Sequence, residues 1–287
     1  MSDEANEPKL SDMQYRIVKP LGTGAGSTIF LIADKNRGGQ KFALKVVNRQ
    51  DSDDDIYIDQ AKTEFEVSQK LKHPAIVRIY DCRLKKSFFR VTGVDLLMEY
   101  LEGKPLDELQ GLDMGQLCLI FDRIASGLVM MHRRGVFHGD MKPSNIMLTK
   151  AGQVKLIDLG TAWIKGRDKN RIQGTPQYIA PETITDKVVD ERTDIYNFGA
   201  TMYRMFTGRF ANLGPPKPGD NPKNKVVAPM QINPKIPGTL NELIMECLDQ
   251  NRDKRPTMHE VKGKLEAVVR YLGLSEADLQ GPPEDEE

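Results

Sequence analysis

The spacing of apolar residues changes near residue 100 of this chain, and that change limits the folds open to it. Before this point the apolar residues stand in short runs bounded by glycine and polar residues, which is typical of β-strands. After it they recur every three or four positions, which is typical of amphipathic helices. We therefore expect an α+β chain with antiparallel strands first and helices afterwards. The pattern predicts strands at 15–21, 27–33, 41–47, 76–81 and 94–100, and helices at 58–71 and 114–134.

The charge composition argues against several kinds of partner. The 287 residues include 41 Lys and Arg and 41 Asp and Glu, so the formal charge is zero and we expect no nucleic-acid partner. The longest stretch without a charged side chain, 20–33, is 14 residues long. Because a helix that crosses a bilayer needs roughly 20 apolar residues, we expect no membrane span.

The cysteines indicate the cellular compartment of the protein, and the composition of its two ends indicates whether those ends are ordered. The three cysteines form no C-x-x-C pair and residues 1–9 hold no apolar signal core, so we expect reduced thiols and a cytoplasmic location. Residues 1–12 are polar and acidic and are predicted to form a disordered tail. Residues 273–287 are predicted to form an acidic, proline-containing tail. The segment 214–237 holds seven of the 17 prolines and is predicted to be an irregular loop.

A glycine turn joins the first two predicted strands. Gly22, Gly24 and Gly26 punctuate the segment 22–29. Since the turn links two strands rather than a strand and a helix, it argues against a dinucleotide-binding fold. Glycines let backbone N–H groups approach phosphate oxygens with no Cβ in the way. Taken alone, the turn is a weak signal, because glycine-rich hairpins are usually only turns; a phosphate-binding loop is the less common alternative.

Lys45 stands inside the apolar third strand. An unpaired ammonium group is costly to bury, so this position requires an anionic partner. Glu64 can supply it, because Glu64, Val67 and Leu71 are spaced i, i+3 and i+7 and share one face of the predicted helix. An exposed ion pair that contributes little to stability is the alternative.

The strongest motif lies between residues 136 and 160, where the chain has VFHGDMKPSNIML and then VKLIDLG. Its chemistry-bearing residues form an ordered series with further motifs downstream. The series is His138-x-Asp140-x-Lys142-x-x-Asn145, Asp158-Leu159-Gly160, GTPQYIAPE at 174–182, Asp194-x-x-x-Phe198-Gly199, and Arg255. Over about 15–272 the chain thus resembles the eukaryotic-like protein kinases, and it resembles their Ser/Thr branch, bacterial forms included, better than the tyrosine branch.

The resemblance implies a two-lobed kinase fold and a reaction. The kinase domain is expected at 13–272, with a small antiparallel β lobe carrying one key helix at about 13–98, a hinge at 99–101 and a larger, mainly helical lobe at 102–272. The implied activity is transfer of the ATP γ-phosphoryl group to Ser or Thr hydroxyls of a protein substrate. The implied metal is Mg²⁺, for which Mn²⁺ can substitute.

Catalytic and metal-binding roles follow from the same resemblance. Asp140 is expected to accept or orient the proton of the substrate hydroxyl, and Lys142 to offset charge on the transferred phosphoryl group. Asp158 is expected to bind Mg²⁺, and Asn145 to supply its amide oxygen to a second ion, because both oxygen ligands suit a hard cation. Thr175 is expected to align Asp140 with Lys142 and to shape the substrate platform.

Two further groups of residues are assigned by the resemblance. Glu182 with Arg255 is expected to form a structural ion pair, and Asp194 to cap the backbone of the catalytic loop. Lys45, held by Glu64, is expected to anchor the α and β phosphates. The full set expected around ATP is Leu21, Gly22, Thr23, Gly24, Ala25, Gly26, Ser27, Ile29, Ala43, Lys45, Glu64, Met98, Glu99, Leu101 and Met147.

The chain departs from the family pattern at several positions. Ser27 stands where the third glycine is usual, and Leu159 and Ser68 predict a thinner apolar contact between the lobes. Gly139 replaces the arginine that reads a phosphate on the activation loop, and Thr161 is the only hydroxyl residue in 161–173. We therefore expect no control by activation-loop phosphorylation.

Two other functions stay open beside the Ser/Thr kinase. A pseudokinase that binds nucleotide and acts as an interaction module is one alternative, motivated by the altered glycine turn. A small-molecule phosphotransferase can share the aspartates and the asparagine. It has no reason to carry GTPQYIAPE, the segment that builds the peptide platform in protein kinases.

Overall fold

The computed structural model describes residues 7–24, 26–49, 55–88, 90–167, 173–186, 189–211 and 226–279. These residues divide into two compact units. Unit 1 comprises the described parts of Met1–Lys72, Ile76–Glu102 and Asp158–Gly160. Unit 2 comprises the described parts of His73–Ala75, Gly103–Ile157 and Thr161–Glu287. The residues predicted as a hinge, 99–101, belong to unit 1.

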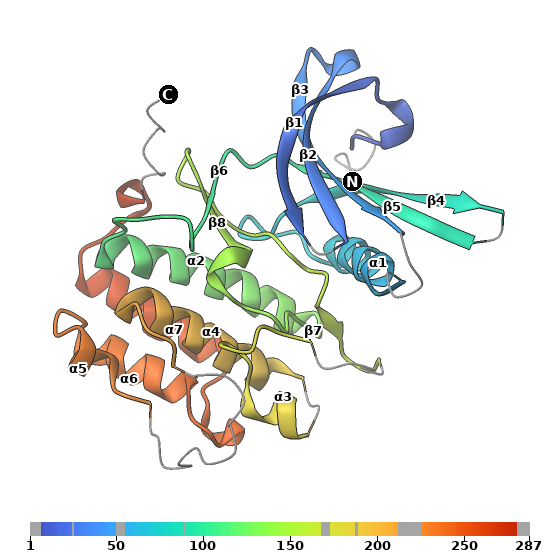
Figure 1. The fold of residues 1–287 in the computed structure, drawn as a ribbon. Coiled ribbons are helices and arrows are strands. Elements are labelled where there is room, and N and C mark those ends of the chain that lie inside the picture. The colour runs from blue at the N-terminus through green and yellow to red at the C-terminus, as the bar shows by residue number, and fades with distance from the viewer. Residues whose placement is uncertain are drawn as a thin grey trace. The chain divides into compact units, whose positions relative to one another are not determined.

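Unit 1 is built on a five-stranded antiparallel sheet with one helix, α1 (Figure 1). The strand order is β1-β2-β3-β5-β4. The elements are β1 Tyr15–Gly24, β2 Ser27–Asp34, β3 Gln40–Asn48, α1 Asp55–Lys70, β4 Ile79–Ser87 and β5 Arg90–Glu99. The strand predicted at 76–81 is misplaced, because β4 starts at Ile79 and runs on through polar residues whose pairing with β5, rather than burial, makes them a strand.

The two faces of this sheet have different partners. Successive side chains of a strand point to opposite faces. Phe42 and Leu44 of β3 belong to a buried cluster with Ile32 of β2 and Leu97 of β5. Lys45 directly follows Leu44 in β3, so its side chain points to the other face of the sheet. On that face α1 packs against β3, β4 and β5. The same alternation that builds the core therefore delivers the lysine to the helix.

The predicted disordered tail at 1–12 is wrong for the residues that the structure describes. Leu10 is only 3% exposed and joins the buried cluster on the sheet together with Met13. A short 3₁₀ turn, Leu10–Asp12, positions it, and the Leu10 N–H donates to Oδ2 of Asp81 at 2.8 Å. The sequence is polar around Leu10, so only the apolar sheet face, distant in sequence, reveals where this side chain is buried.

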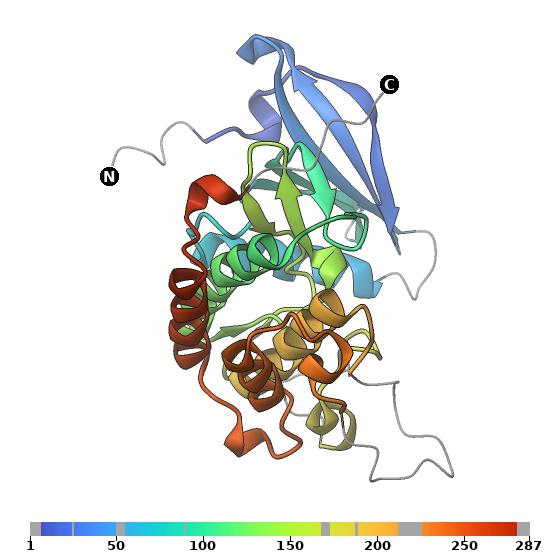
Figure 2. The same cartoon turned by 90° about the vertical axis from the view of Figure 1, so that its left-hand side faces the viewer.

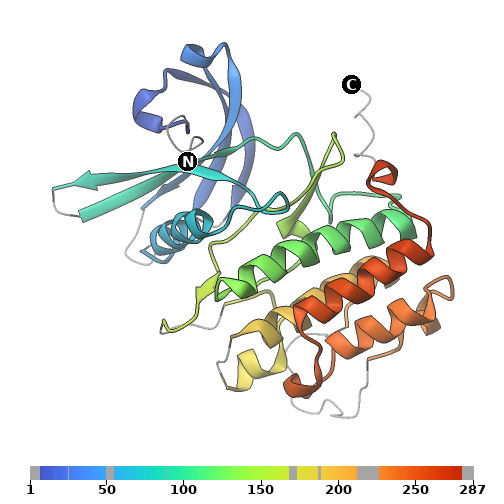
Figure 3. The same cartoon turned by 180° about the vertical axis from the view of Figure 1, so that it is seen from behind.

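Unit 2 is mainly helical. Its helices are α2 Met114–Arg133, α3 Pro181–Thr185, α4 Glu191–Thr207, α5 Pro229–Ile232, α6 Gly238–Cys247 and α7 Met258–Tyr271. The helices α2, α4 and α7 each begin at a capping box, in which the side chains of Asp113, Asp190 and Thr257 accept from backbone N–H groups one turn on. Helix α2 packs against α7 and α4, and α7 runs beside it in Figure 3.

Short strands carry the segments between these helices. Three of them, β6 Gly103–Pro105, β8 Ile146–Thr149 and β9 Val154–Leu156, form one small sheet near α2 (Figure 2). Two others, β7 Val136–Phe137 and β10 Trp163–Ile164, pair antiparallel. A 3₁₀ turn, Pro143–Asn145, leads directly into β8. The stretch between β7 and β8 is therefore held at both ends.

The remaining predictions for unit 2 hold in part. The short helix α5 interrupts the predicted loop at 214–237, of which 214–225 lies outside the described residues. The predicted C-terminal tail begins with a 3₁₀ turn, Glu276–Asp278, capped by Ser275; residues 280–287 lie outside the described part. By length and composition alone, Met114–Arg133 could cross a membrane, but 61% of its most apolar stretch is buried inside the protein, as in the core helix of a unit.

Candidate active site

A buried ion pair joins β3 to α1. Nζ of Lys45 lies 2.6 Å from Oε2 of Glu64, and the Glu64 side chain has no exposed surface. Burial by itself would lower the pKa of Lys45, but the carboxylates of Glu64 and Asp158 outweigh it, so the pKa is raised and the lysine is charged. The alternative of an exposed, weak pair is therefore wrong. Unit 1 holds a fixed cation on the face of its sheet.

Asp158 belongs to the same unit as this pair. The Gly160 N–H donates to its Oδ1 at 3.0 Å, which fixes the direction of the carboxylate. Its charge is one of the causes that raise the pKa of Lys45, so the two groups lie close enough to interact. The geometry of Asp158 leaves it half-buried, with a carboxylate suited to a hard cation.

The glycine turn between β1 and β2 is a two-residue hairpin turn. Gly24 pairs with Ser27 across the strands, so only positions 25 and 26 connect them. Gly26 has a φ of 69°, a left-handed value that favours glycine, as expected for such turns. Ser27, in the usual place of a third glycine, is the first residue of β2. The glycine stands one step early because the turn requires it at 26; Ala25 lies outside the described residues.

The other predicted nucleotide contacts of unit 1 are spread over four strands. Ala43 pairs with Met98 across β3 and β5, and both are buried. Ile29 on β2 lies opposite Lys45 on β3, because the two residues pair across these strands. Leu21 is 41% exposed on β1. Gly22 and Thr23, also on β1, are exposed as well.

The predicted hinge residues need one refinement. The N–H of Glu99 donates to the carbonyl of Arg78 at 3.0 Å, within the sheet. Glu99 would therefore accept a hydrogen bond from adenine with its backbone carbonyl oxygen rather than donate one. Leu101 is half-buried in unit 1, and Met147 is half-buried on β8 in unit 2.

Unit 2 holds a compact polar triangle. Oδ1 of Asp140 accepts from the Thr175 N–H at 2.7 Å, and its Oδ2 lies 2.9 Å from Nζ of Lys142. The Lys142 ammonium also donates to Oγ1 of Thr175 at 3.0 Å. Asp140 is 5% exposed. The three residues thus orient one another around the Asp140 carboxylate.

Asn145 lies at the end of the 3₁₀ turn that follows this triangle. Its Nδ2 donates to the backbone carbonyl of Asp140 at 2.8 Å. Because the amide nitrogen is used in this way, the amide oxygen is the atom that remains for a cation. Its backbone carbonyl accepts from the N–H of Ile157, which ties the loop to the strand pair β8–β9.

Asp194 binds the backbone of the catalytic loop, residues 138–145. Its carboxylate accepts from the N–H groups of His138 and Gly139, both at 2.8 Å, and contacts Nε2 of His132 at 2.9 Å. Burial by itself would raise the pKa of Asp194, but the hydrogen bond to His132 and the other donors outweigh it and lower the pKa. The predicted cap is present. Gly139 has a φ of 77°, which a residue with a Cβ rarely adopts.

The predicted structural pair Glu182–Arg255 is also present. The two terminal guanidinium nitrogens of Arg255 donate to the Glu182 carboxylate, at 2.6 and 2.9 Å, and the Arg255 side chain is fully buried. Arg255 also donates to the carbonyls of Asp249 and Arg192, each at 2.8 Å. The pair joins α3 to the segment before α7.

Sequence reasoning missed two buried supports of the loop. His132, in the last turn of α2, shares the carboxylate of Asp194. Thr201 of α4 donates to the carbonyl of Met141 at 3.1 Å. Neither residue belongs to a recognisable motif, and His132 could have been noticed only as a polar residue on the otherwise apolar face of a helix.

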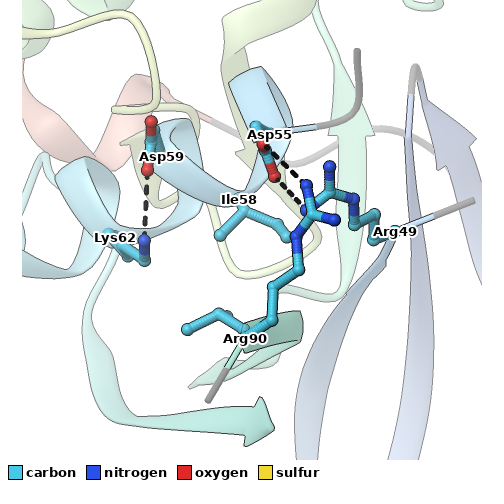
Figure 4. Close-up of a pocket in the computed structure, with 7 residues that line it drawn as sticks. Arg49, Asp55, Ile58, Asp59, Lys62 and Arg90 are labelled. Atoms are coloured by element: carbon cyan, nitrogen blue, oxygen red, sulfur yellow. Dashed lines mark hydrogen bonds and ion pairs between the residues drawn. The ribbon is translucent and has the colours of Figure 1, made fainter. Parts of the chain in front are cut away.

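Among the described residues, no group of three or more His, Cys, Asp and Glu side chains could hold a metal ion. A pocket of about 280 Å³ in unit 1 is lined by none of the residues predicted around ATP (Figure 4). Its charged side chains pair with one another: Asp55 with Arg49 and Arg90, and Asp59 with Lys62.

Comparison with known proteins adds a family and relatives. The protein kinase domain family matches residues 15–264. The serine/threonine-protein kinase pkn2 of Myxococcus xanthus is 29% identical over 94% of this chain and 34% of its own length. PksC of Streptomyces coelicolor is 28% identical over 86% of this chain and 47% of its own length, and PknA of Mycobacterium tuberculosis is 28% identical over 83% and 57%. The chain thus spans about a third to three fifths of these relatives.

Proposed function

The chain belongs to the protein kinase domain family, and from this premise we propose that it transfers the γ-phosphoryl group of ATP to serine or threonine hydroxyls of proteins. The observation that carries the proposal is the polar triangle of Asp140, Lys142 and Thr175 in unit 2. A hydroxyl that donates to the Asp140 carboxylate would be held beside the Lys142 ammonium. That is the arrangement needed to orient a nucleophile next to a phosphoryl group.

Each residue of the triangle has its own task in this proposal. Asp140 receives the hydroxyl proton as the new P–O bond forms. Lys142 balances negative charge on the phosphoryl oxygens and is the mark of Ser/Thr kinases in this family. Thr175 holds both partners, which reduces the freedom that would otherwise be lost on reaching the transition state.

Unit 1 supplies the groups that suit ATP. Lys45 is held by Glu64 and is charged, so it suits a polyphosphate. The turn at Gly26 offers backbone at the start of β2, the strand that pairs with the strand of Lys45. The donor atoms proposed for the metal, the Asp158 carboxylate and the Asn145 amide oxygen, are hard oxygens that fit Mg²⁺. Bound Mg²⁺ would neutralise phosphate charge; Asp158 would hold one ion, and Asn145 would supply its amide oxygen to a second ion.

The proposal is tested by following γ-labelled phosphate from Mg-ATP to a generic Ser/Thr-containing protein. We expect label on serine or threonine, and a loss of roughly a hundredfold or more in Asp158→Ala, because a metal-binding carboxylate is removed. ATP binding without transfer would instead support the pseudokinase. Transfer confined to small alcohols would support the small-molecule phosphotransferase.

We further propose that activation-loop phosphorylation does not control this kinase. Gly139 supplies no arginine to read a phosphate, and its left-handed backbone makes a Cβ-bearing residue unfavourable there. Thr161 donates its hydroxyl to the His138 carbonyl at 3.2 Å, so it is engaged with the catalytic loop. Residues 168–172 lie outside the described part of the chain and contain no Ser, Thr or Tyr.

A phosphatase experiment checks this proposal. Phosphatase treatment of the purified protein is expected to leave its initial rate of phosphoryl transfer unchanged, since the loop offers neither acceptor nor reader. Phosphosite mapping of the untreated protein is the companion measurement. An activating phosphate within 161–173 would contradict the proposal.

We also propose that the protein works in a reducing compartment such as the cytoplasm. Cys82, Cys118 and Cys247 are free thiols. Burial raises the pKa of Cys82 to about 11 and that of Cys118 to about 12, so both stay protonated and unreactive at neutral pH.

A further inference from the structure

The first turn of α1 reaches the glycine turn. A Cβ placed on Gly26 would lie 2.2 to 2.8 Å from three ring carbons of Tyr57, far inside contact distance. The aromatic ring therefore lies directly against the backbone of Gly26. No other glycine of this turn is approached by a distant element: a Cβ on Gly22 meets nothing within 4 Å, and one on Gly24 meets only Ser27 at 3.4 Å.

Tyr57 shares its helix face with two residues that touch other proposed ATP-binding segments. Gln60, three positions on, lies beside Gly160: a Cβ placed on Gly160 would be 3.5 Å from the Cβ of Gln60, an ordinary contact distance. Glu64, seven positions on, binds Lys45. Positions i, i+3 and i+7 lie on one side of a helix. This side of α1 thus meets the glycine turn, the Asp158–Gly160 segment and the phosphate-anchoring lysine in succession.

The end of α1 that carries Tyr57 is itself tied to the sheet. Asp55 lies 2.8 Å from the Arg49 guanidinium, just beyond β3, and 3.9 Å from that of Arg90 at the start of β5 (Figure 4). The N–H of Arg49 also donates to the carbonyl of Thr92. Ile58, next to Tyr57, is 2% exposed. The end of α1 that carries the ring is therefore fixed to the sheet, whereas β1, which leads into the turn, is exposed along nearly its whole length.

We propose that Tyr57 is a positioning residue that holds the β1–β2 glycine turn in the conformation that binds the phosphates of ATP. The inference rests on the proposed function, because it assigns the turn to ATP. A turn held by the ring is ordered before ATP arrives. Without the ring, ATP binding must itself order the turn, and this loss of backbone freedom is expected to weaken binding roughly tenfold.

This role explains the position of the third glycine. A side chain at 26 would both strain a left-handed backbone and overlap the Tyr57 ring. Glycine at 26 and tyrosine at 57 are therefore a matched pair. Ser27 carries no such restriction, since it lies in β2.

The test measures the dissociation constant of a non-hydrolysable Mg-ATP analogue by calorimetry, without any turnover. Tyr57→Ala is expected to weaken binding about tenfold, because alanine keeps the helix but removes the ring. Tyr57→Phe keeps the ring and is expected to bind like the wild type. The matched control is Lys62→Ala on the same helix, whose ammonium contacts only Asp59 among the described ion pairs.

Hydrogen exchange of a peptide covering 21–29, in protein without nucleotide, supplies the second readout. Exchange is expected to speed up in Tyr57→Ala but not in Tyr57→Phe or Lys62→Ala. If Tyr57→Ala does not fold, the test uses two other variants, Gly26→Ala and Tyr57→Phe. Gly26 lies at an exposed turn. The expected result is that Gly26→Ala speeds exchange and weakens binding, while Tyr57→Phe does neither.

The two variants together test the contact itself. The effect of Gly26→Ala on binding is expected to be smaller in the Tyr57→Ala background, because the overlap with the ring is gone and only the backbone strain remains. Equal affinity for wild type and Tyr57→Ala, or effects that simply multiply, would overturn the inference. A wild-type protein that does not bind the analogue at all would instead overturn the proposed function.

Discussion

Replacing Asp140 with asparagine is expected to lower the rate of phosphoryl transfer by roughly 10²- to 10⁴-fold, the range that general-base catalysis contributes. Asparagine has the same shape and can still accept from the Thr175 N–H, which Asp140 does at 2.7 Å. It has no basic carboxylate to take the hydroxyl proton, and it removes the negative partner of Lys142. The loss should therefore appear in the chemical step.

The measurement is single-turnover transfer at saturating Mg-ATP, with ATP affinity and thermal stability measured beside it. Affinity is expected to change little, because no role in ATP binding is assigned to Asp140. The matched control is Asp253→Asn, whose side chain is 85% exposed. A variant of Asp140 that retains more than a tenth of the wild-type rate would contradict the assignment of the proton acceptor.

Truncating Arg255 is expected to cause the largest loss of stability. Its fully buried guanidinium makes two hydrogen bonds to Glu182 and two to backbone carbonyls, and lies 4.8 Å from the ring centre of Tyr196. Removing one partner of a buried ion pair leaves an uncompensated charge and typically costs about 3–5 kcal/mol. Arg255→Met should therefore lower the free energy of unfolding of unit 2 by about this amount.

Urea unfolding followed by the fluorescence of Trp163, the only tryptophan of the chain, reports on unit 2. Lys264→Met is the matched control, because Lys264 pairs with Glu246 at the surface, where such pairs contribute about 0–1 kcal/mol. Glu182→Leu combined with Arg255→Met is expected to recover part of the loss, since no unpaired charge remains. An Arg255→Met variant as stable as the control would contradict the prediction.

The stability difference should depend on pH. Burial by itself would raise the pKa of Glu182, but Arg255 outweighs burial and lowers it. A carboxyl group with a lowered pKa stabilises the folded state above its unfolded pKa, and this contribution is lost as the pH falls through the lowered value. The gap between wild type and Arg255→Met is therefore expected to be full at pH 7 and to shrink in acid, below the ordinary Glu range of about 4.3.

Contacts between residues close together in the sequence follow most directly from a motif. The pairing of Lys142 with Asp140, which the sequence analysis expected, spans two positions. Such contacts follow from local backbone geometry, so a motif of fixed spacing predicts them. The strands β1 to β3 were predicted nearly to their ends for a similar reason, because their apolar runs are bounded by turn residues.

Errors arose where a partner lies far along the chain. The strand β4 was predicted too early because its outer residues are polar and owe their conformation to pairing with β5. Leu10 was placed in a tail, although its N–H bonds to Asp81, 71 positions away. His132 was missed because Asp194, its partner, is 62 positions distant.

The sequence by itself determined the kind of fold, the family resemblance and the identity of the chemical groups, because hydrophobic period and motif spacing are properties of neighbouring residues. The tertiary structure alone decided that the pair of Lys45 and Glu64, which the sequence suggested, is buried, that Asp194 is shared by His132 and the catalytic loop, and that Tyr57 rests on Gly26. These contacts join segments whose separation no periodicity encodes. They form only when the apolar faces of strands and helices are buried together and bring their polar neighbours into reach.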